Sequence, residues 1–243
     1  MVWHELLGIG VALTVVMNAA LSAEPKTIYD APDQNAVKSI LPRVPPTAPA
    51  DASETFRVLD GFRMDLLAAE PFVASPVAMT YDENGRAYVC EMRDYPYTNK
   101  AKHQPNQENP TDESIGCVRL LEDIDGDSVF DKSTLFAEGM SWPTGVACWK
   151  GGVYVAATPD IWYLKDHDGD GKADERRKVL TGFRKLNVQA VMNNLVWGLD
   201  NHIHGAGGTN GGQIRPGDQP DAKPAMLSRN DFRIDPATGD MEL

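Results

Sequence analysis

The sequence VRLLEDIDGD at Val118–Asp127 returns as IWYLKDHDGD at Ile161–Asp170, 43 residues further along the chain. In both copies an apolar run leads into an Asp-x-Asp-Gly-Asp loop. The match continues downstream, where Asp131 corresponds to Asp174. A period of about 40 to 50 residues is typical of the four-stranded sheets, or blades, of a β-propeller. The repeat therefore predicts that fold.

Short apolar alternations broken by Gly, Asp and Asn continue on both sides of the repeat, without a sustained helical period. This pattern predicts an all-β protein. A further strand is expected at Phe62–Ala69, where it could complete the last blade of a closed ring. A propeller needs about four to eight blades to close, so we expect about three blades of an incomplete ring. The expected strands are 76–81, 86–92, 116–122 and 134–138, then 144–149, 153–157, 161–165 and 178–181, then 194–198, 202–206 and 231–235.

The N-terminal residues have the pattern of a targeting segment. Leu6–Met17 is an almost uninterrupted apolar run, and Ser22 and Ala23 are small residues that suit a signal peptidase. We expect a signal peptide over 1–23, although its first residues contain no Lys or Arg; an uncleaved membrane anchor and a buried helix are the alternatives. Residues 24–55 are expected to form a Pro/Ala-rich linker, and 56–243 the propeller segment. The protein is then exported, to the periplasm or the cell surface.

The net charge narrows the classes of molecule that the chain could bind. The net charge of −12 disfavours binding to nucleic acid, whose phosphates would repel the chain.

Three cysteines are present in a chain predicted to be exported. A Cys90–Cys117 disulfide is the most plausible bridge, and three small buried thiols are the alternative.

The two aspartate loops are candidate calcium sites. Each places carboxylates at relative positions 1, 3, 5 and 9, and oxygen ligands at this spacing can wrap a Ca²⁺ ion. Position 12 is Thr134 or Arg177 rather than Glu, which predicts weak sites with Kd of about 10⁻⁴ to 10⁻³ M. A structural role is expected, and hairpin turns that bind no metal are the alternative. The proposed ligands are Asp123, Asp125, Asp127 and Asp131 in the first loop, and Asp166, Asp168, Asp170 and Asp174 in the second.

Other loops carry candidate ligand-binding residues. Arg93, in Glu91–Tyr97, follows an expected strand and could hold an anion, or form an ordinary ion pair with a neighbouring acid. His202 and His204 stand at i and i+2 on one strand face, as a base, as metal ligands or as a hydrogen-bonded pair. The glycine-rich stretch after them, 205–212, would let a ligand approach the backbone.

Taken together, four stretches resemble a known family: 83–96 (ENGRAYVCEMRDYP), 119–123 (RLLED), 142–146 (WPTGV) and 197–201 (WGLDN). They resemble the N-terminal domain of the membrane-bound dehydrogenases of the Planctomycetes/Verrucomicrobia type, which are also described as haem-binding proteins. The resemblance covers about 56–243. It implies a six-bladed propeller similar to soluble quinoprotein glucose dehydrogenase, with a c-type cytochrome domain further downstream in the full-length protein.

The same resemblance implies a cofactor and site residues. The wider quinoprotein sugar dehydrogenases bind pyrroloquinoline quinone and calcium. Their catalytic His corresponds to a position near Ala190, where this sequence has no histidine. Their cofactor loop resembles Gly205–Gly211 and makes Asn210 a candidate contact. A quinone site would then use Arg93 and His204 as catalytic residues, with Gln189, Asn210 and Arg93 on the cofactor.

Two functions follow. The first is a dehydrogenase-like domain that oxidises a sugar or alcohol and passes electrons to a c-type haem beyond these residues. The second is a non-catalytic propeller, stabilised by calcium, that binds a glycan or a protein partner. Contact with a membrane is expected only through an uncleaved N-terminal segment.

Overall fold

The computed structural model describes residues 44–98, 101–102, 108 and 113–243. The chain divides into two units, and the second, Pro49–Leu243, holds every strand described. The expected signal peptide lies outside the described residues. Of the expected linker, only residues 44–55 are described, and they contain a short helix α3 (Pro49–Ala52) and a 3₁₀ turn η1 (Ser53–Thr55). Among the described helices, none has the length and apolar character needed to cross a membrane.

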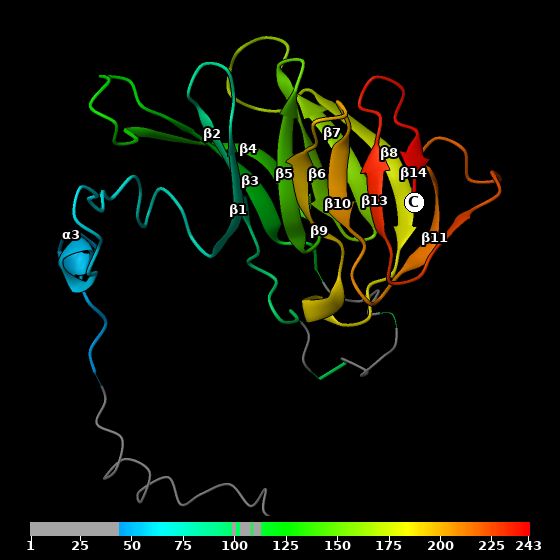
Figure 1. Cartoon of the computed structure of the whole chain (residues 1–243), viewed down its shortest axis with the longest axis horizontal. Helices are drawn as coiled ribbons and strands as arrows, with labels where there is room; N and C mark the ends of the chain where they lie inside the picture. Colours follow the sequence, from blue (N-terminus) through cyan, green and yellow to red (C-terminus); the bar gives the residue numbers. More distant parts are fainter. Residues whose placement is uncertain (1–43, 99–100, 103–107, 109–112) are drawn as a thin grey trace, which may run out of the picture. The chain divides into compact units, whose positions relative to one another are not determined.

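The second unit is built from three antiparallel sheets, none of which closes on itself (Figure 1). The first sheet contains β1 (Pro76–Tyr81), β2 (Ala87–Glu91), β3 (Gly116–Glu122) and β4 (Lys132–Met140). The second contains β5 (Pro143–Trp149), β6 (Gly152–Ala157), β7 (Asp160–Lys165) and β8 (Glu175–Phe183), and is extended by β11 (Gly212–Pro216) and β12 (Ala225–Leu227). The third contains β9 (Asn193–Trp197), β10 (Ile203–Ala206), β13 (Asp231–Ile234) and β14 (Met241–Glu242). The strands expected from Pro76 onwards are therefore present, with shifted ends.

The second sheet has six strands instead of the expected four. The chain leaves the third sheet after β10, forms the hairpin β11–β12, and returns to the third sheet at β13. β11 pairs with the outer strand of the second sheet, with Gly212 opposite Phe183 and Arg215 opposite Thr181. The hairpin was not predicted. It covers part of an edge whose backbone groups would otherwise have no partners.

The sheets pack face to face around their first strands, since β5 contacts both β1 and β9 (Figure 1). The face of the first sheet with Tyr88 and Leu120 packs against Val155 of the second sheet. The opposite face of the second sheet, with Tyr154, packs against Ile203 in the third. Alternate residues of β6 point to opposite faces, so both of its faces are buried.

A glycine sets the closest approach between β5 and β9. A Cβ atom at Gly145 would lie 3.0 Å from the backbone nitrogen of Leu195 and 3.2 Å from that of Asn194. Any larger residue would push β9 away from β5. The glycine of the Trp-Pro-Thr-Gly stretch is thus required by the packing of the second sheet against the third.

The expected strand at Phe62–Ala69 is not formed, because no strand in the described residues pairs with it. The segment still lies where an outer strand would lie. The N–H of Phe130 donates to Leu67 O at 3.0 Å, and the N–H of the equivalent Ala173 donates to Phe136 O of β4 at 2.8 Å. Leu67 therefore contacts the end of the first aspartate loop in the same way that β4 contacts the end of the second.

The three cysteines are free thiols, so the expected Cys90–Cys117 disulfide is wrong. In the β2–β3 ladder Cys90 is opposite Val118, and Cys117 is opposite Glu91. Neighbouring residues of a strand point to opposite faces. Cys90 accordingly packs between the first two sheets, while Cys117 shares the other face with the Glu91 carboxylate.

Burial makes these thiols poor nucleophiles. It raises the pKa of Cys90 to about 12 and, with the Glu91 carboxylate, that of Cys117 to about 12; burial raises the pKa of Cys148 to about 11. We expect slow reaction of the native protein with a disulfide reagent, since the thiolate is the reactive species. Unfolding in guanidinium without reductant should release three reactive thiols. If only one reactive thiol were counted after unfolding, the other two cysteines would have to form a disulfide.

Candidate functional site

The two aspartate loops connect the third and fourth strands of the first and second sheets and share one set of hydrogen bonds. Asp123 Oδ1 and Oδ2 accept from the N–H groups of Gly126 and Ser128 at 2.7 and 2.9 Å. Asp166 accepts in the same way from Gly169 and Gly171 at 2.7 and 2.8 Å. Each loop is thus held in the same conformation by hydrogen bonds between its first carboxylate and its own backbone N–H groups.

Each loop brings three of its four expected carboxylates together. Oxygen atoms of Asp123, Asp125 and Asp131 all lie within 4.8 Å of one another, and so do those of Asp166, Asp168 and Asp174. The carboxylates at position 5 are not in these groups. Asp127 and Asp170 instead accept from the N–H groups of Val129 and Lys172, each at 2.8 Å.

The second loop is also fixed to the neighbouring sheet, through the Ala173 N–H described above. The carboxyl of Asp166 is held ionised. Partial burial opposes its ionisation, but the backbone N–H groups of Gly169, Gly171 and Asp168, with the nearby Arg86, outweigh burial and lower its pKa. A negatively charged oxygen cluster of this size suits a hard divalent cation such as Ca²⁺.

The other candidate residues lie mainly at the opposite ends of the strands. Arg93 follows β2, Gln189 lies in the 3₁₀ turn η2 (Val188–Ala190) between β8 and β9, and Asn210 follows β10. The neighbours Met92 and Val188 pack in one cluster with Trp142. The antiparallel topology therefore collects Arg93, Gln189 and Asn210 at one end of the sheets, away from the aspartate loops.

Arg93 is held by a buried carboxylate. Glu91 is fully buried, and its Oε2 lies 2.8 Å from Arg93 Nε and 2.6 Å from Arg93 Nη2. Arg119 Nε lies 3.6 Å from the same oxygen, and the Ala74 N–H donates to Oε1 at 2.7 Å. Two guanidinium groups thus share one buried carboxylate. The sequence-based alternative of an ordinary ion pair describes Arg93 well, although its partner is Glu91 rather than the neighbouring Asp94.

Gln189 and Asn210 lie in two loops that contact each other. The side-chain amide of Asn210 donates to Asn187 O at 2.9 Å and to Arg184 O at 3.2 Å, and its backbone N–H donates to Ala190 O at 3.0 Å. Asn210 therefore binds its own chain in this structure. The side chain of Asn187 accepts from the Gln189 N–H and caps the 3₁₀ turn.

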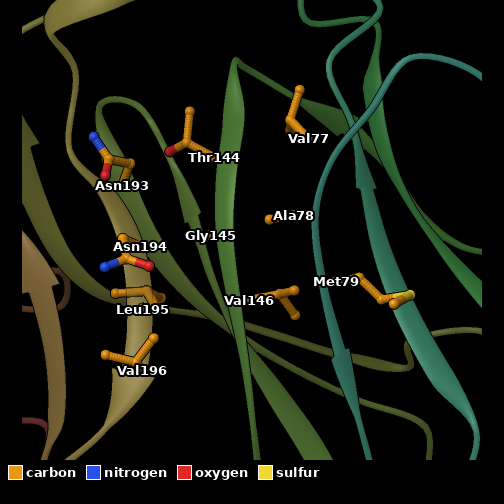
Figure 2. Close-up of a pocket in the computed structure, with 10 residues that line it drawn as sticks. All are labelled: Val77, Ala78, Met79, Thr144, Gly145, Val146, Asn193, Asn194, Leu195 and Val196. Carbon is orange, nitrogen blue, oxygen red and sulfur yellow. The ribbon is translucent and has the colours of Figure 1, made fainter. Parts of the chain in front are cut away.

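A cleft of about 520 Å³ lies along the first strands of the three sheets (Figure 2). Ala78 of β1, Gly145 of β5 and Asn194 of β9 line it, and Thr144 Oγ1 donates to Met192 O across the gap at 2.6 Å. All three first strands have a register shift against their neighbours at this end. Such bulges often redirect side chains beside binding sites. Sequence reasoning missed the cleft, although the Pro76 and Pro143 strand starts were a signal of irregular pairing.

His204 is separated from the other candidates by the length of β10. It sits near the start of that strand, and its Nε2 lies 2.9 and 3.1 Å from the two carboxylate oxygens of Asp200 in the preceding turn. Arg233 Nη1 donates to Asp200 at 2.8 Å. His202 Nδ1 lies 2.8 Å from Asp200 O. These contacts agree with the interpretation of His202 and His204 as a hydrogen-bonded pair rather than as a base or metal ligands.

Comparison with known proteins gives a family and one weak structural likeness. A family model described as "Domain of unknown function (DUF7133)" matches residues 48–243. No curated protein matches the chain. One similar solved structure is titled "Iodide structure of Trichoderma reesei Carbohydrate-Active Enzymes Family AA12"; it is 17% identical with a TM-score of 0.36, over 62% of this chain and 37% of that chain. A likeness of this size carries no argument about fold or function.

The contacts of Asp200 predict a pH dependence. The hydrogen bond from His204 has the largest effect and lowers the pKa of Asp200, and the hydrogen bond from Arg233 lowers it further. Desolvation opposes them, but its effect is smaller than that of His204. A carboxyl whose pKa is lower in the folded state stabilises the fold above its unfolded pKa of about 3.9. That contribution is lost as the pH falls through the lower, folded value. We expect Asp200→Asn to flatten the acid limb of a plot of melting temperature against pH. An unchanged acid limb would show that these contacts do not stabilise the fold.

Proposed function

We propose that this chain, which belongs to the DUF7133 family, is an exported segment of a calcium-stabilised β-propeller. Its ligand would bind at the end of the sheets that carries Arg93, Gln189 and Asn210. The observation that carries the proposal is the identity of the two aspartate loops. In both, the same three positions converge and the same backbone N–H groups orient the carboxylates. Two turns that bind no common ligand would not need the same three converging carboxylates or the same orienting N–H groups.

The sheet packing supports the propeller. Successive sheets stack face to face around their first strands, and the first four strands of the first and of the second sheet each form a consecutive run of hairpins. In this proposal the first strands β1, β5 and β9 line the central channel, and the cleft of about 520 Å³ is part of that channel.

Calcium would act on stability rather than on chemistry. The loops lie at the ends of the sheets away from Arg93, Gln189 and Asn210, so a cation there would not reach a ligand bound beside those residues. Its contribution would be to offset two of the three negative charges in each group and to hold the third and fourth strands together. The calcium concentration outside cells suits weak sites of this kind.

The calcium proposal predicts a shift in melting temperature. At a calcium concentration ten times the Kd, each loop should gain about 1.4 kcal/mol, or about 3 °C for a chain of this size. The double variant Asp125→Asn/Asp168→Asn should lose the shift because both residues belong to the converging groups. The matched control Asp127→Asn/Asp170→Asn removes the same charge outside those groups and should keep it. Equal behaviour of the two variants would contradict the proposal.

A dehydrogenase is the second candidate, and the grouping of Gln189 with Asn210 favours it. The resemblance to quinoprotein dehydrogenases would place pyrroloquinoline quinone near these side chains, with electrons passing to a haem domain elsewhere in the protein. The fit to that cofactor is poor. Described residues 184–192 contain no histidine, His204 is bound to Asp200 at the other end of β10, and Arg93 is held by Glu91. A proton acceptor for alcohol oxidation is not provided by these groups.

Cofactor titration separates the two candidates. The propeller without catalysis predicts no saturable binding of pyrroloquinoline quinone and no sugar-dependent reduction of a dye when quinone and Ca²⁺ are both supplied. The measurement is quenching of tryptophan fluorescence on titration, followed by the dye assay with sugars and alcohols. Saturable binding that Asn210→Ala abolishes, together with dye reduction, would favour the dehydrogenase.

A further inference from the structure

The hairpin β11–β12 creates a cavity of about 390 Å³ where it joins the second sheet, and this cavity is lined by Thr181, Gly182, Arg184, Gln213 and Arg215. We propose that it binds the anionic group of a small molecule, a carboxylate or sulfate, between Arg184 and Arg215. The site is separate from the aspartate loops and from the cleft along the first strands. It adjoins Asn210, whose side-chain amide donates to the backbone oxygen of Arg184.

The cavity exists because the pairing between β8 and β11 is irregular. Their register shifts between Gly212 and Arg215. Gly182 lies inside this shift with φ +103°, and a Cβ atom there would stand 2.1 Å from Gln213 O. A larger residue would therefore force the strands apart. A Cβ atom at the equivalent Gly139 of β4 would have no described atom within 4 Å, because no hairpin among the described residues joins the first sheet. The pocket is thus a consequence of the added hairpin.

Arg215 is the residue that points to a ligand. Its Nη1 donates to Pro220 O at 3.0 Å, while its Nε is buried without a hydrogen-bond partner. Among the described residues no carboxylate forms an ion pair with it, in a chain of net charge −12. The Nε atom is closed to solvent, so an oxyanion in the cavity would meet the part of the Arg215 side chain that lines it and would offset a charge that no carboxylate among the described residues offsets.

The other lining groups leave room for that anion. Arg184 Nε lies 3.3 Å from Glu108 Oε1, but both side chains are about half exposed, so this pair is weak and open to exchange. The nearby Asp160 carboxylate is occupied by the Thr181 hydroxyl and by Lys178 Nζ at 2.9 Å. The cavity lining itself contains two arginines and no acidic residue. Its volume falls within the range of small-molecule pockets, about 300 to 1,000 Å³.

The test measures binding of sulfate and of glucuronate by isothermal titration calorimetry, with chloride at equal ionic strength as the reference. We expect saturable binding to the unaltered chain. Loss of one charged hydrogen bond should weaken the Kd at least about tenfold in Arg215→Gln. Arg57→Gln removes the same charge from an exposed residue outside the cavity and should bind as the unaltered chain does.

Arg184→Gln provides a second variant on a half-exposed residue, so binding can be tested even if Arg215→Gln does not fold. It should also weaken the Kd. Binding of both anions would assign the site to oxyanions in general, and binding of glucuronate alone to carboxylates. No saturable binding to the unaltered chain, or equal weakening by Arg57→Gln, would overturn the proposal. Neither result depends on calcium or quinone binding.

Discussion

The structure depends on one constraint: a sheet with two apolar faces must be covered on both. Every residue of β6 is buried, so the second sheet needs a partner on each side, and the first and third sheets provide them. β2 is also buried throughout, and there the second cover is the segment around Leu67 and Val73 rather than a sheet. The third sheet is different, because its outward face carries His204 and Arg233 and is only partly buried.

Much of this arrangement could be predicted from the sequence. The 43-residue repeat located the aspartate loops and, from them, the strands of the first two sheets. Strand formation at Phe62–Ala69 could not be judged, because a strand requires a partner and the sequence does not say whether one is present. The hairpin β11–β12 was missed for a related reason. Its strands are short, Pro216 and Pro224 flank its connection, and its partner β8 is distant in the sequence.

The site residues divide in the same way. Local spacing predicted the aspartate clusters, but not that Asp127 and Asp170 lie outside them, because the spacing does not fix the direction of each carboxylate within the loop. Strand alternation placed His202 and His204 on one face, but it could not foresee that Asp200 would bind them. Arg215 carried no signal at all. That no described carboxylate pairs with it becomes visible only when the hairpin is placed against β8.

The crossing of the hairpin from the third sheet to the second has a consequence for synthesis of the chain. The first sheet is complete once Met140 has left the ribosome. The second sheet is not complete until Leu227 has emerged, after β9 and β10 have already been made. Its outer edge must stay open while two strands of another sheet are formed, and contacts between distant segments form slowly. The second and third sheets therefore reach their final form together, whereas the first needs no strand from beyond Met140 and waits only for the second sheet to cover its inner face.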